Sequence, residues 1–441
     1  SYLARINYGF KSRYYIDASW RTDGSSRFHP SDRWGHFWSV GASWRISEEQ
    51  FMENTRQWLD NLTLKVSYGV QGNDNLGTYY AWQGLYDYTW PNATDAGAFV
   101  DKLENRKVTW EKNGNLNAGI EATMFGGRLG VSVEYYNRKT RDMLLNSPLP
   151  ISTGFTGFND NVGSLRNQGL EVSLRGTILD KRDFRWDATL MGSFNRNKVL
   201  SLTGGQDVIT SGIRVIEVGR PIYTFYLPKT AGVDPATGKQ LYYAYWTQTV
   251  NDEGTLVNTR CDEYITDNVA MATLSKYYHE SREPKLFGSI GSTFTILKNI
   301  DVSFLTTYSI GGWVYDGLYN GSMYVQYAGN NWHKNAKRRW QKPGDKTDVP
   351  MLEVGGSYAT TSNSLIDASY FAIKNITVGY TLPKRWLKKI DIESLRIYAT
   401  LDNIAMFNHM DGMDPQYNFT GSVAYSYTPS RVIAFGIDLN F

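Results

Sequence analysis

The last eleven residues, RVIAFGIDLNF (431–441), show the pattern that decides the fold of this chain. Apolar and polar side chains alternate along this segment. One face carries Ile433, Phe435, Ile437, Leu439 and Phe441, and the other carries Ala434, Gly436, Asp438 and Asn440. Because successive side chains of a β-strand point to opposite faces, this period of two predicts a strand that separates an apolar from an aqueous surrounding.

The same alternation recurs along the chain in segments of about ten residues. Residues 62–70 and 116–124 repeat it most clearly, with apolar residues on one face and polar residues or glycine on the other. The pattern predicts about thirteen strands, at residues 2–10, 13–21, 37–46, 62–70, 116–124, 129–138, 168–177, 185–195, 286–296, 301–310, 370–380, 394–402 and 431–441. One strand breaks the phase at Lys374, where a β-bulge near Asn375 would restore it.

The connections between these strands alternate in length. The shorter set comprises 11–12, 47–61, 125–128, 178–184, 297–300 and 381–393, and the longer set comprises 22–36, 71–115, 139–167, 196–285, 311–369 and 403–430. Outer-membrane barrels have short periplasmic turns and long extracellular loops. The alternation therefore predicts an all-β fold, a transmembrane antiparallel β-barrel with Phe441 at the periplasmic end.

Composition supports this interpretation. The 441 residues include 31 Tyr, 19 Phe, 14 Trp and 41 Gly, and the mean hydropathy is −0.43. The longest uncharged apolar runs stay well short of the roughly 18 residues that a membrane-spanning helix needs. Polar lumen residues dilute the lipid-facing ones in a barrel, which flattens the hydropathy profile. A soluble sandwich or propeller is the alternative, but its strands average about five or six residues and its loops are short on both sides.

Charge and cysteine content exclude several functions. The net charge is +3, and the one basic run, Lys334 to Arg339, is better explained as a solvated loop than as a nucleic-acid site. The single cysteine, Cys261, allows neither an internal disulfide nor a thiolate metal cluster. No catalytic motif is visible, and we expect no enzyme activity, metal or cofactor.

Eight blocks of the sequence resemble, in order, the SusC/RagA-like group of TonB-dependent transporters. They are ASWRTDGSSRF (18–28), WGHFWSVGASWRISEEQF (34–51), LTLKVSYGVQGN (62–73), VTWEKNGNLNAGIE (108–121), NVGSLRNQGLEVSL (161–174), FAIKNITVGYTLP (371–383), LRIYATLDNI (395–404) and MDP (413–415). Gln71 replaces the threonine that the family usually has in the third block.

The resemblance implies a barrel of about 22 strands around a plug domain, far wider than thirteen strands can close. Residues 1–441 then form the C-terminal part of the barrel, and we expect the remaining strands, the plug and the segment that contacts TonB–ExbB–ExbD to precede Ser1. The family also implies a location in the Gram-negative outer membrane, a SusD-like lipoprotein lid, and Phe441 as part of a barrel-assembly signal.

The implied function is energised import of an oligosaccharide, with a peptide as the main alternative. A passive porin and a surface carbohydrate-binding protein remain further alternatives. The loops 71–115, 196–285 and 311–369 are rich in aromatic residues, which can stack on sugars, dock a lid or pack within the loops. The candidate contact residues are Tyr79, Tyr80, Trp82, Trp90, Trp313, Tyr315 and Trp332.

Overall fold

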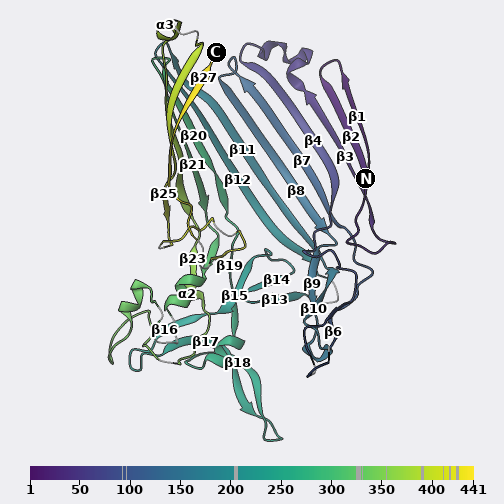
Figure 1. Ribbon diagram of the computed structural model, residues 1–441, viewed down its shortest axis with the longest axis vertical. Coiled ribbons are helices and arrows are strands. Elements are labelled where there is room, and N and C mark those ends of the chain that lie inside the picture. Colours follow the sequence, from purple (N-terminus) through teal and green to yellow (C-terminus); the bar gives the residue numbers. More distant parts are fainter. Residues whose placement is uncertain are drawn as a thin grey trace.

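One antiparallel sheet of thirteen strands dominates the computed structural model (Figure 1). Its strands are β1 (Tyr2–Phe10), β2 (Tyr14–Gly24), β3 (Trp34–Arg45), β4 (Leu59–Asn73), β7 (Glu111–Met124), β8 (Leu129–Arg141), β11 (Ser164–Lys181), β12 (Phe184–Ser201), β20 (Leu286–Ile296), β21 (Ile300–Ile310), β24 (Tyr370–Thr381), β25 (Ser394–Asn408) and β27 (Val432–Asn440). Each pairs with the neighbouring sheet strands in sequence order. The thirteen predicted strands are confirmed.

The structure describes residues 1–91, 93–95, 97–202, 207–323, 329, 331–353, 355–388, 392–410, 412–416, 419–423 and 427–441. Within these ranges, no helix is both long enough and apolar enough to cross a membrane.

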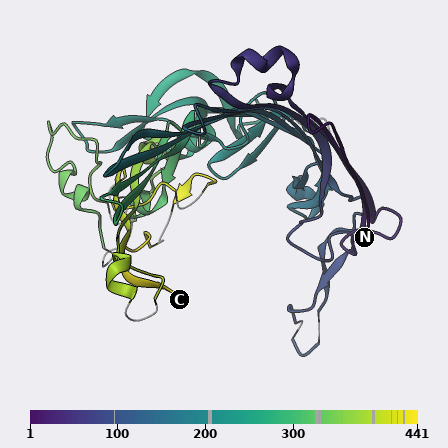
Figure 2. The ribbon, with the colours of Figure 1, turned by 90° about the horizontal axis from the view of Figure 1, so that it is seen from above.

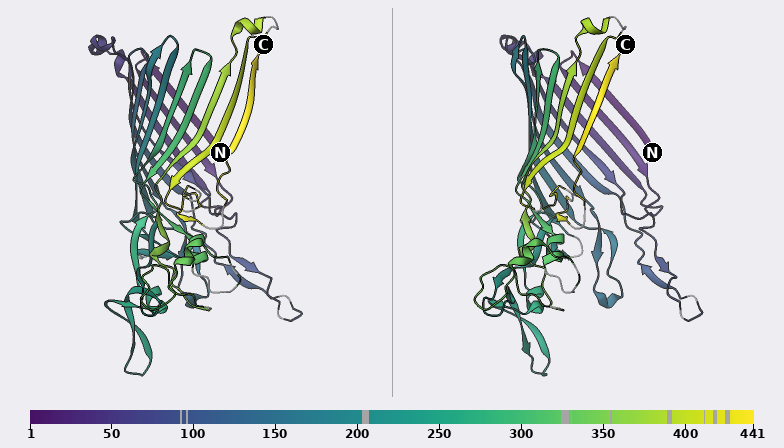
Figure 3. Two further views of the ribbon diagram at one scale, coloured as in Figure 1. Left: turned by 90° about the vertical axis from the view of Figure 1, so that its left-hand side faces the viewer. Right: turned by 60° about the vertical axis from the view of Figure 1, so that its left-hand side comes forward.

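The sheet curves into an arc whose two edges are β1 and β27 (Figure 2). The shorter connections lie together at one end of the strands, which we call the turn end, and the longer ones lie at the other, the loop end (Figure 3). Several strands run past their predicted limits at the loop end; β12, for example, continues to Ser201 and β25 to Asn408. In these added parts, polar and apolar residues occur on both faces, so the alternation that identified the strands fades there.

The pairing register joins the apolar residues of the thirteen strands into one continuous face. Ala18 pairs with Ile6 on one side and with Val40 on the other. At the opposite edge of the sheet, Ile397 pairs with Ile437, which is 67% exposed. A slip of one residue in any pair would turn its apolar side chains to the other face, so the pattern fixes the register.

Aromatic rings cluster at both ends of this apolar face. At the loop end, Trp38 packs on Tyr68 with ring centroids 5.6 Å apart. At the turn end, Trp186 stacks on Phe294 at 5.7 Å, and Tyr14 stacks on Trp44 at 6.5 Å. Two aromatic rows that border an apolar band are typical of surfaces that meet the two interfaces of a bilayer.

The other face of the sheet is polar. Its ion pairs join Arg5 to Asp17 (2.8 Å), Lys65 to Glu121 (2.5 Å), and Arg396 to both Asp301 (2.7 Å) and Asp438 (3.1 Å). Position 436 on this face is a glycine, and a Cβ there would come within 2.3 Å of the Tyr398 ring. The face combines opposite charges with small residues that leave room for large side chains.

The polar face is the concave one. Phe37 lies on it and packs against Trp110 of the loop segments. The loop before Trp110 is hydrogen-bonded to the β9–β10 hairpin, since Thr109 N donates to Asn161 Oδ1 at 2.8 Å. That hairpin, β9 (Leu144–Pro148) and β10 (Gly157–Asn161), lies inside the arc in Figure 2.

The bulge predicted near Asn375 is confirmed. Leu305 pairs with Asn375 and Thr306 with Ile373, so Lys374 has no partner across the strand. The same shift occurs between β24 and β25. The extra residue returns Ile376 and Ile373 to the same face, which keeps the apolar face continuous across the break in phase.

The loop segments have secondary structure of their own. Their other strands are β5 (Leu85–Asp87), β6 (Phe99–Lys102), β13 (Val208–Ser211), β14 (Arg214–Glu217), β15 (Thr224–Pro228), β16 (Thr230–Val233), β17 (Gln240–Val250), β18 (Leu256–Thr266), β19 (Lys276–Ser281), β22 (Trp313–Asp316), β23 (Leu365–Asp367) and β26 (Ser422–Val423). Their helices are α1 (Val269–Leu274), α2 (Gly317–Met323), η3 (Ile151–Thr153), η4 (Lys334–Arg338) and η5 (Ser362–Ser364), while η1 (Ile46–Glu48), η2 (Gln50–Thr55) and α3 (Lys384–Leu387) lie in the turns.

Small separate cores hold these segments together. One contains Phe28, Phe37, Val108 and Trp110 at the loop end of β3. Another contains Phe225, Leu227, Tyr315 and Leu365, which brings two of the long loops into contact. The sheet itself, with solvent-accessible faces on both sides, has no comparable core among its described strands.

Candidate functional site

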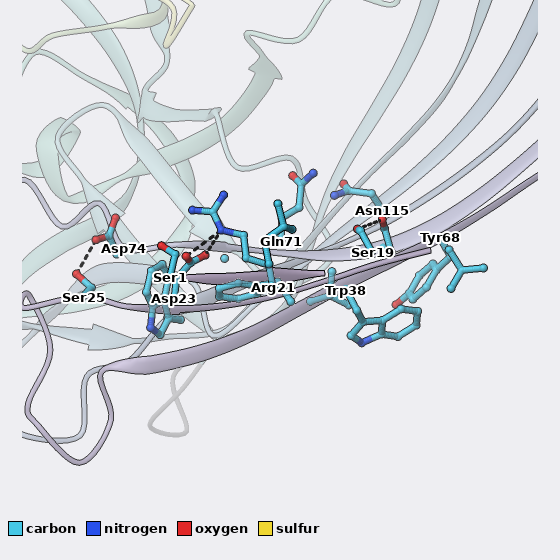
Figure 4. Close-up of a pocket in the computed structure, with 18 of the residues that line it drawn as sticks. Ser1, Ser19, Arg21, Asp23, Ser25, Trp38, Tyr68, Gln71, Asp74 and Asn115 are labelled. Atoms are coloured by element: carbon cyan, nitrogen blue, oxygen red, sulfur yellow. Dashed lines mark hydrogen bonds and ion pairs between the residues drawn. The ribbon is translucent and has the colours of Figure 1, made fainter. Parts of the chain in front are cut away.

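A polar cavity of about 1010 Å³ opens on the concave face at the loop end of β2, β3 and β4 (Figure 4). Figure 4 shows Arg21, Gln71 and Asn115 on one side of the sheet, and Trp38 and Tyr68 on the opposite side. Because successive side chains of a strand point to opposite faces, the same strands supply both the cavity wall and the apolar face.

Hydrogen bonds fasten the rim of this cavity. The Ser25 hydroxyl donates to Asp74 Oδ2 at 2.7 Å, and Arg27 donates from Nη1 to the Asp74 carbonyl oxygen at 3.1 Å. The Arg27 guanidinium also lies 4.6 Å from the centroid of the Tyr79 ring. A cation over a ring face is attracted by its quadrupole, so Arg27 orients the otherwise exposed Tyr79 toward the rim.

Glycines make the approach of the loops possible. At Gly72 an added Cβ would come within 2.1 Å of the Phe37 ring, and at Gly35 within 2.4 Å. The Phe37 ring therefore fills the space of two missing side chains and packs on Trp110 and Phe28. This contact anchors the loop segments that border the cavity.

The charges of the cavity wall are compensated. Arg21 Nε lies 2.7 Å from Asp23 Oδ2, and Arg27 Nη1 lies 3.8 Å from Asp74 Oδ1. Asn117 Oδ1, which is buried on the same wall, accepts no hydrogen bond from the residues that the structure describes. The wall therefore presents many hydrogen-bonding groups and little net charge, as suits a polar uncharged ligand.

A second cavity, of about 590 Å³, lies between two of the long loops and is lined by Arg220, Tyr278, His279 and Trp313. Arg220 stacks on the Tyr278 ring at 3.7 Å, and its Nε donates to Glu217 Oε2 at 2.5 Å. Burial lowers the pKa of His279, and a nearby lysine acts in the same direction. The imidazole is therefore neutral at pH 7.

The seven aromatic candidates do not form one site. Tyr79 borders the first cavity and Trp313 lines the second. Tyr80 and Trp90 are exposed, at 57% and 65%, and Trp90 contacts Phe99 edge-to-face at 6.2 Å. The structure brings Tyr79 and Tyr80 to the loop end of β4 and places Trp90 farther along the same loop.

The remaining candidates pack within the loop cores. Trp82 lies against the core around Phe28 and contacts His29 edge-to-face. Tyr315 is a member of the core around Phe225 and is only 7% exposed. Trp332 packs on the core of Met323, Ala336 and Val349. These positions favour loop packing over ligand contact for Trp82, Tyr315 and Trp332.

The polar residues of the first cavity were not predicted from the sequence. Arg27, Asp74 and Asn117 were not predicted as site residues, because a polar residue at the end of a barrel strand is common and carries no distinctive spacing. Their one signal is that Arg27 and Asp74 closely follow β2 and β4 at the loop end, and these two strands flank β3 in the sheet. Within the described ranges, no group of three or more His, Cys, Asp or Glu residues could hold a metal ion.

Similarity to known proteins agrees with this architecture. The family model for the TonB dependent receptor-like β-barrel matches residues 2–404. The TonB-dependent receptor SusC of Bacteroides thetaiotaomicron is 29% identical to the whole chain, which covers 43% of that relative. The TonB-dependent receptor P26 of Formosa agariphila is also 29% identical to the whole chain, which covers 46% of it.

Among solved structures, the RagAB peptide transporter matches the whole chain with a TM-score of 0.85 and 30% identity, over 47% of the matched chain. The present chain thus spans about half the length of the relatives it matches. The family model, the full-length alignments and the shared fold agree, and we conclude that this chain belongs to the TonB-dependent receptor β-barrel family, in its SusC/RagA-like group.

Proposed function

We propose that the whole protein imports an oligosaccharide across the outer membrane with energy from TonB–ExbB–ExbD, and that this chain supplies much of the barrel wall and ligand-binding loops. The observation that carries the proposal is the two-sided sheet. Its convex face is apolar with aromatic borders, and its concave face is polar and hollowed at the loop end. Such a wall separates lipid from an aqueous lumen and offers a binding surface on the lumen side.

The edges of the sheet motivate the proposal for the rest of the protein. β1 and β27 would each present unpaired N–H and C=O groups, which hydrocarbon does not tolerate. Strands from elsewhere in the protein would close the barrel between them, and a plug within it would couple the lumen to TonB. This agrees with relatives about twice as long as the chain.

An oligosaccharide is favoured by the compensated charges of the first cavity and by the exposed ring of Tyr79 at its rim. Sugars present C–H faces to aromatic rings and many hydroxyl groups to amides and carboxylates. A peptide is the second candidate, because the solved structure named above is that of a peptide transporter. In either case, a SusD-like lipoprotein would cover the loop end and use exposed aromatic residues such as Trp90.

The experiment is uptake and binding by the full-length protein with its lipoprotein partner. Panels of neutral oligosaccharides and of peptides are tested by calorimetry, and uptake is compared in cells with and without TonB. We expect an oligosaccharide to bind, Tyr79→Ala to weaken binding, and uptake to require TonB. TonB-independent uptake would indicate a passive porin, and binding of peptides alone would reverse the substrate assignment.

Phe441, at 87% exposure, is proposed to belong to the assembly signal. It follows β27 at the turn end, where the C-terminus lies (Figure 3). Deletion of Phe441 should lower the yield of folded protein in heat-modifiability gels. Unchanged yield would remove this role.

A further inference from the structure

The turn end of the sheet carries more exposed positive than negative side chains. Among the described residues of the turns, the exposed basic side chains are Lys11, Arg56, Arg128, Lys181, Arg182, Lys298, Lys384, Arg385 and Lys388. The exposed acidic ones are Glu53, Asp60, Asp180, Asp183 and Glu393. The turns thus carry nine exposed positive charges and five exposed negative ones, although the whole chain has a net charge of only +3. We call the nine residues the basic rim.

Exposed aromatic and apolar side chains accompany the basic rim. Phe51 is 68% exposed and Trp386 is 54% exposed, and Phe125 and Leu297 are exposed as well. Large exposed apolar side chains in turns are costly in water and stable at a membrane–water interface, where an apolar body and a polar neighbour are both satisfied.

Two of the basic side chains lie directly on aromatic rings. Lys11 Nζ is 5.2 Å from the centroid of the Phe10 ring, and the Arg385 guanidinium carbon is 5.8 Å from that of Trp386. These contacts hold each cation beside apolar surface instead of letting it extend freely into water. They place a positive charge where a lipid headgroup would meet its acyl chains.

The basic rim is continuous with the apolar face. Phe10 pairs with Tyr14, and Tyr14 pairs with Trp44, so all three rings belong to the convex face. The helical segment η1–η2 that carries Phe51 lies outside the arc, on its convex side (Figure 2). The positive charge therefore borders the surface that we assign to lipid, not only the lumen.

We propose that the basic rim binds the phosphate groups of anionic phospholipids, whose acyl chains cover the adjoining apolar face. The proposal rests on the proposed function, since it requires that face to contact lipid. A zwitterionic bilayer would cover the apolar face equally well but would leave the excess positive charge without counter-charges. Anionic headgroups supply them, and Trp386, which lies beside Arg385, would sit at headgroup level.

The test uses the full-length protein in nanodiscs that contain phosphatidylcholine alone or mixed with phosphatidylglycerol. Native mass spectrometry measures how much of each lipid stays bound after extraction. The variant Lys384→Gln/Arg385→Gln/Lys388→Gln removes three charges of the rim in one turn. Its matched control, Lys337→Gln/Lys342→Gln/Lys346→Gln, removes three exposed lysines from the loop segments.

We expect wild type to retain phosphatidylglycerol preferentially, with less retention at higher salt. Retention should fall by about fivefold for each rim charge removed that contacts a headgroup. The control variant should behave as wild type. Equal retention of both lipids by wild type, or full retention by the rim variant, would overturn the proposal. Failure to enter nanodiscs of either composition would instead contradict the proposed membrane function.

Discussion

In the thirteen-stranded sheet, the strands follow one another in sequence order, whereas in the loop segments some strands pair out of that order, as β15 does with β19. β22 pairs with β23, some fifty residues later, and also in parallel with β26 near Ser422. The sheet is determined by what surrounds it, because one face must be apolar and the other polar. The loop segments are determined by small cores that combine residues from several loops. Mutations in the sheet and mutations in the loop segments should therefore have different measurable effects.

Removal of a loop core should have the largest local effect. Phe28 is fully buried and packs against Trp110 in the core that also contains Phe37, and Phe28→Ala should cost roughly 3–5 kcal/mol of local stability. Hydrogen exchange should increase in residues 25–33 and 74–110, while the yield of folded barrel stays the same. Tyr427→Ala, which truncates a ring that is 97% exposed, is the control and should change neither. Loss of the whole barrel in Phe28→Ala would show that the two regions are not separable.

A charge on the convex face should damage the sheet instead. Ile437→Arg should cost roughly 2–4 kcal/mol if the residue lies at the bilayer midplane, and it should lower folded yield. Asp438→Asn, one residue away on the concave face, should be nearly silent because Arg396 keeps its pair with Asp301. Folded yield in heat-modifiability gels measures both. Normal assembly of Ile437→Arg together with failure of Asp438→Asn would invert the assignment of the two faces.

The four tryptophans among the candidate contact residues should differ in their roles according to their burial. Trp82, Trp313 and Trp332 are half-buried against cores, so their Ala variants should loosen the loops by roughly 1–2 kcal/mol. Trp90 is exposed, and Trp90→Ala should leave the loops intact and reduce retention of the lipoprotein partner or ligand affinity. Proteolysis, co-purification and calorimetry on the four variants distinguish these roles. If Trp90→Ala matched wild type in every assay, Trp90 would have no part in binding.

The smallest effect should come from a buried carboxyl group in the loop segments. Burial raises the pKa of Glu283, and a hydrogen bond from the Asn197 backbone N–H opposes the rise only in part. Below the unfolded pKa of about 4.5 the group is protonated in both states and has no effect. Above it the unfolded state loses the proton more readily, so local stability falls until the pH passes the raised pKa.

Glu283→Gln should therefore be slightly more stable than wild type at pH 7 and equal to it near pH 4. Hydrogen exchange around Asn197 at the two pH values measures this difference. A Glu283→Gln variant that is less stable at pH 7 would mean that the carboxylate is charged and favourably solvated in the folded state.

The sequence predicted the thirteen sheet strands and the bulge at Lys374 because alternation is imposed locally, residue by residue. It predicted neither the loop strands nor the cores, because contacts such as Tyr315 on Phe225 depend on loops some ninety residues apart. The aromatic candidates were chosen by residue type alone, so they mixed exposed rings with packed ones. The polar wall around Arg27 and Asp74 became visible only when the register brought two strand ends together.

The central claim is that the convex face of the sheet contacts lipid and the concave face contacts water. The most direct measurement labels single cysteines along β27 in the full-length protein, after replacement of Cys261, and records quenching by brominated lipids. Labels at Ile433, Phe435 and Ile437 should be quenched, and labels at Ala434, Asp438 and Asn440 should instead be accessible to a water-soluble quencher. Quenching by lipid at the second set, or no alternation along the strand, would contradict the account.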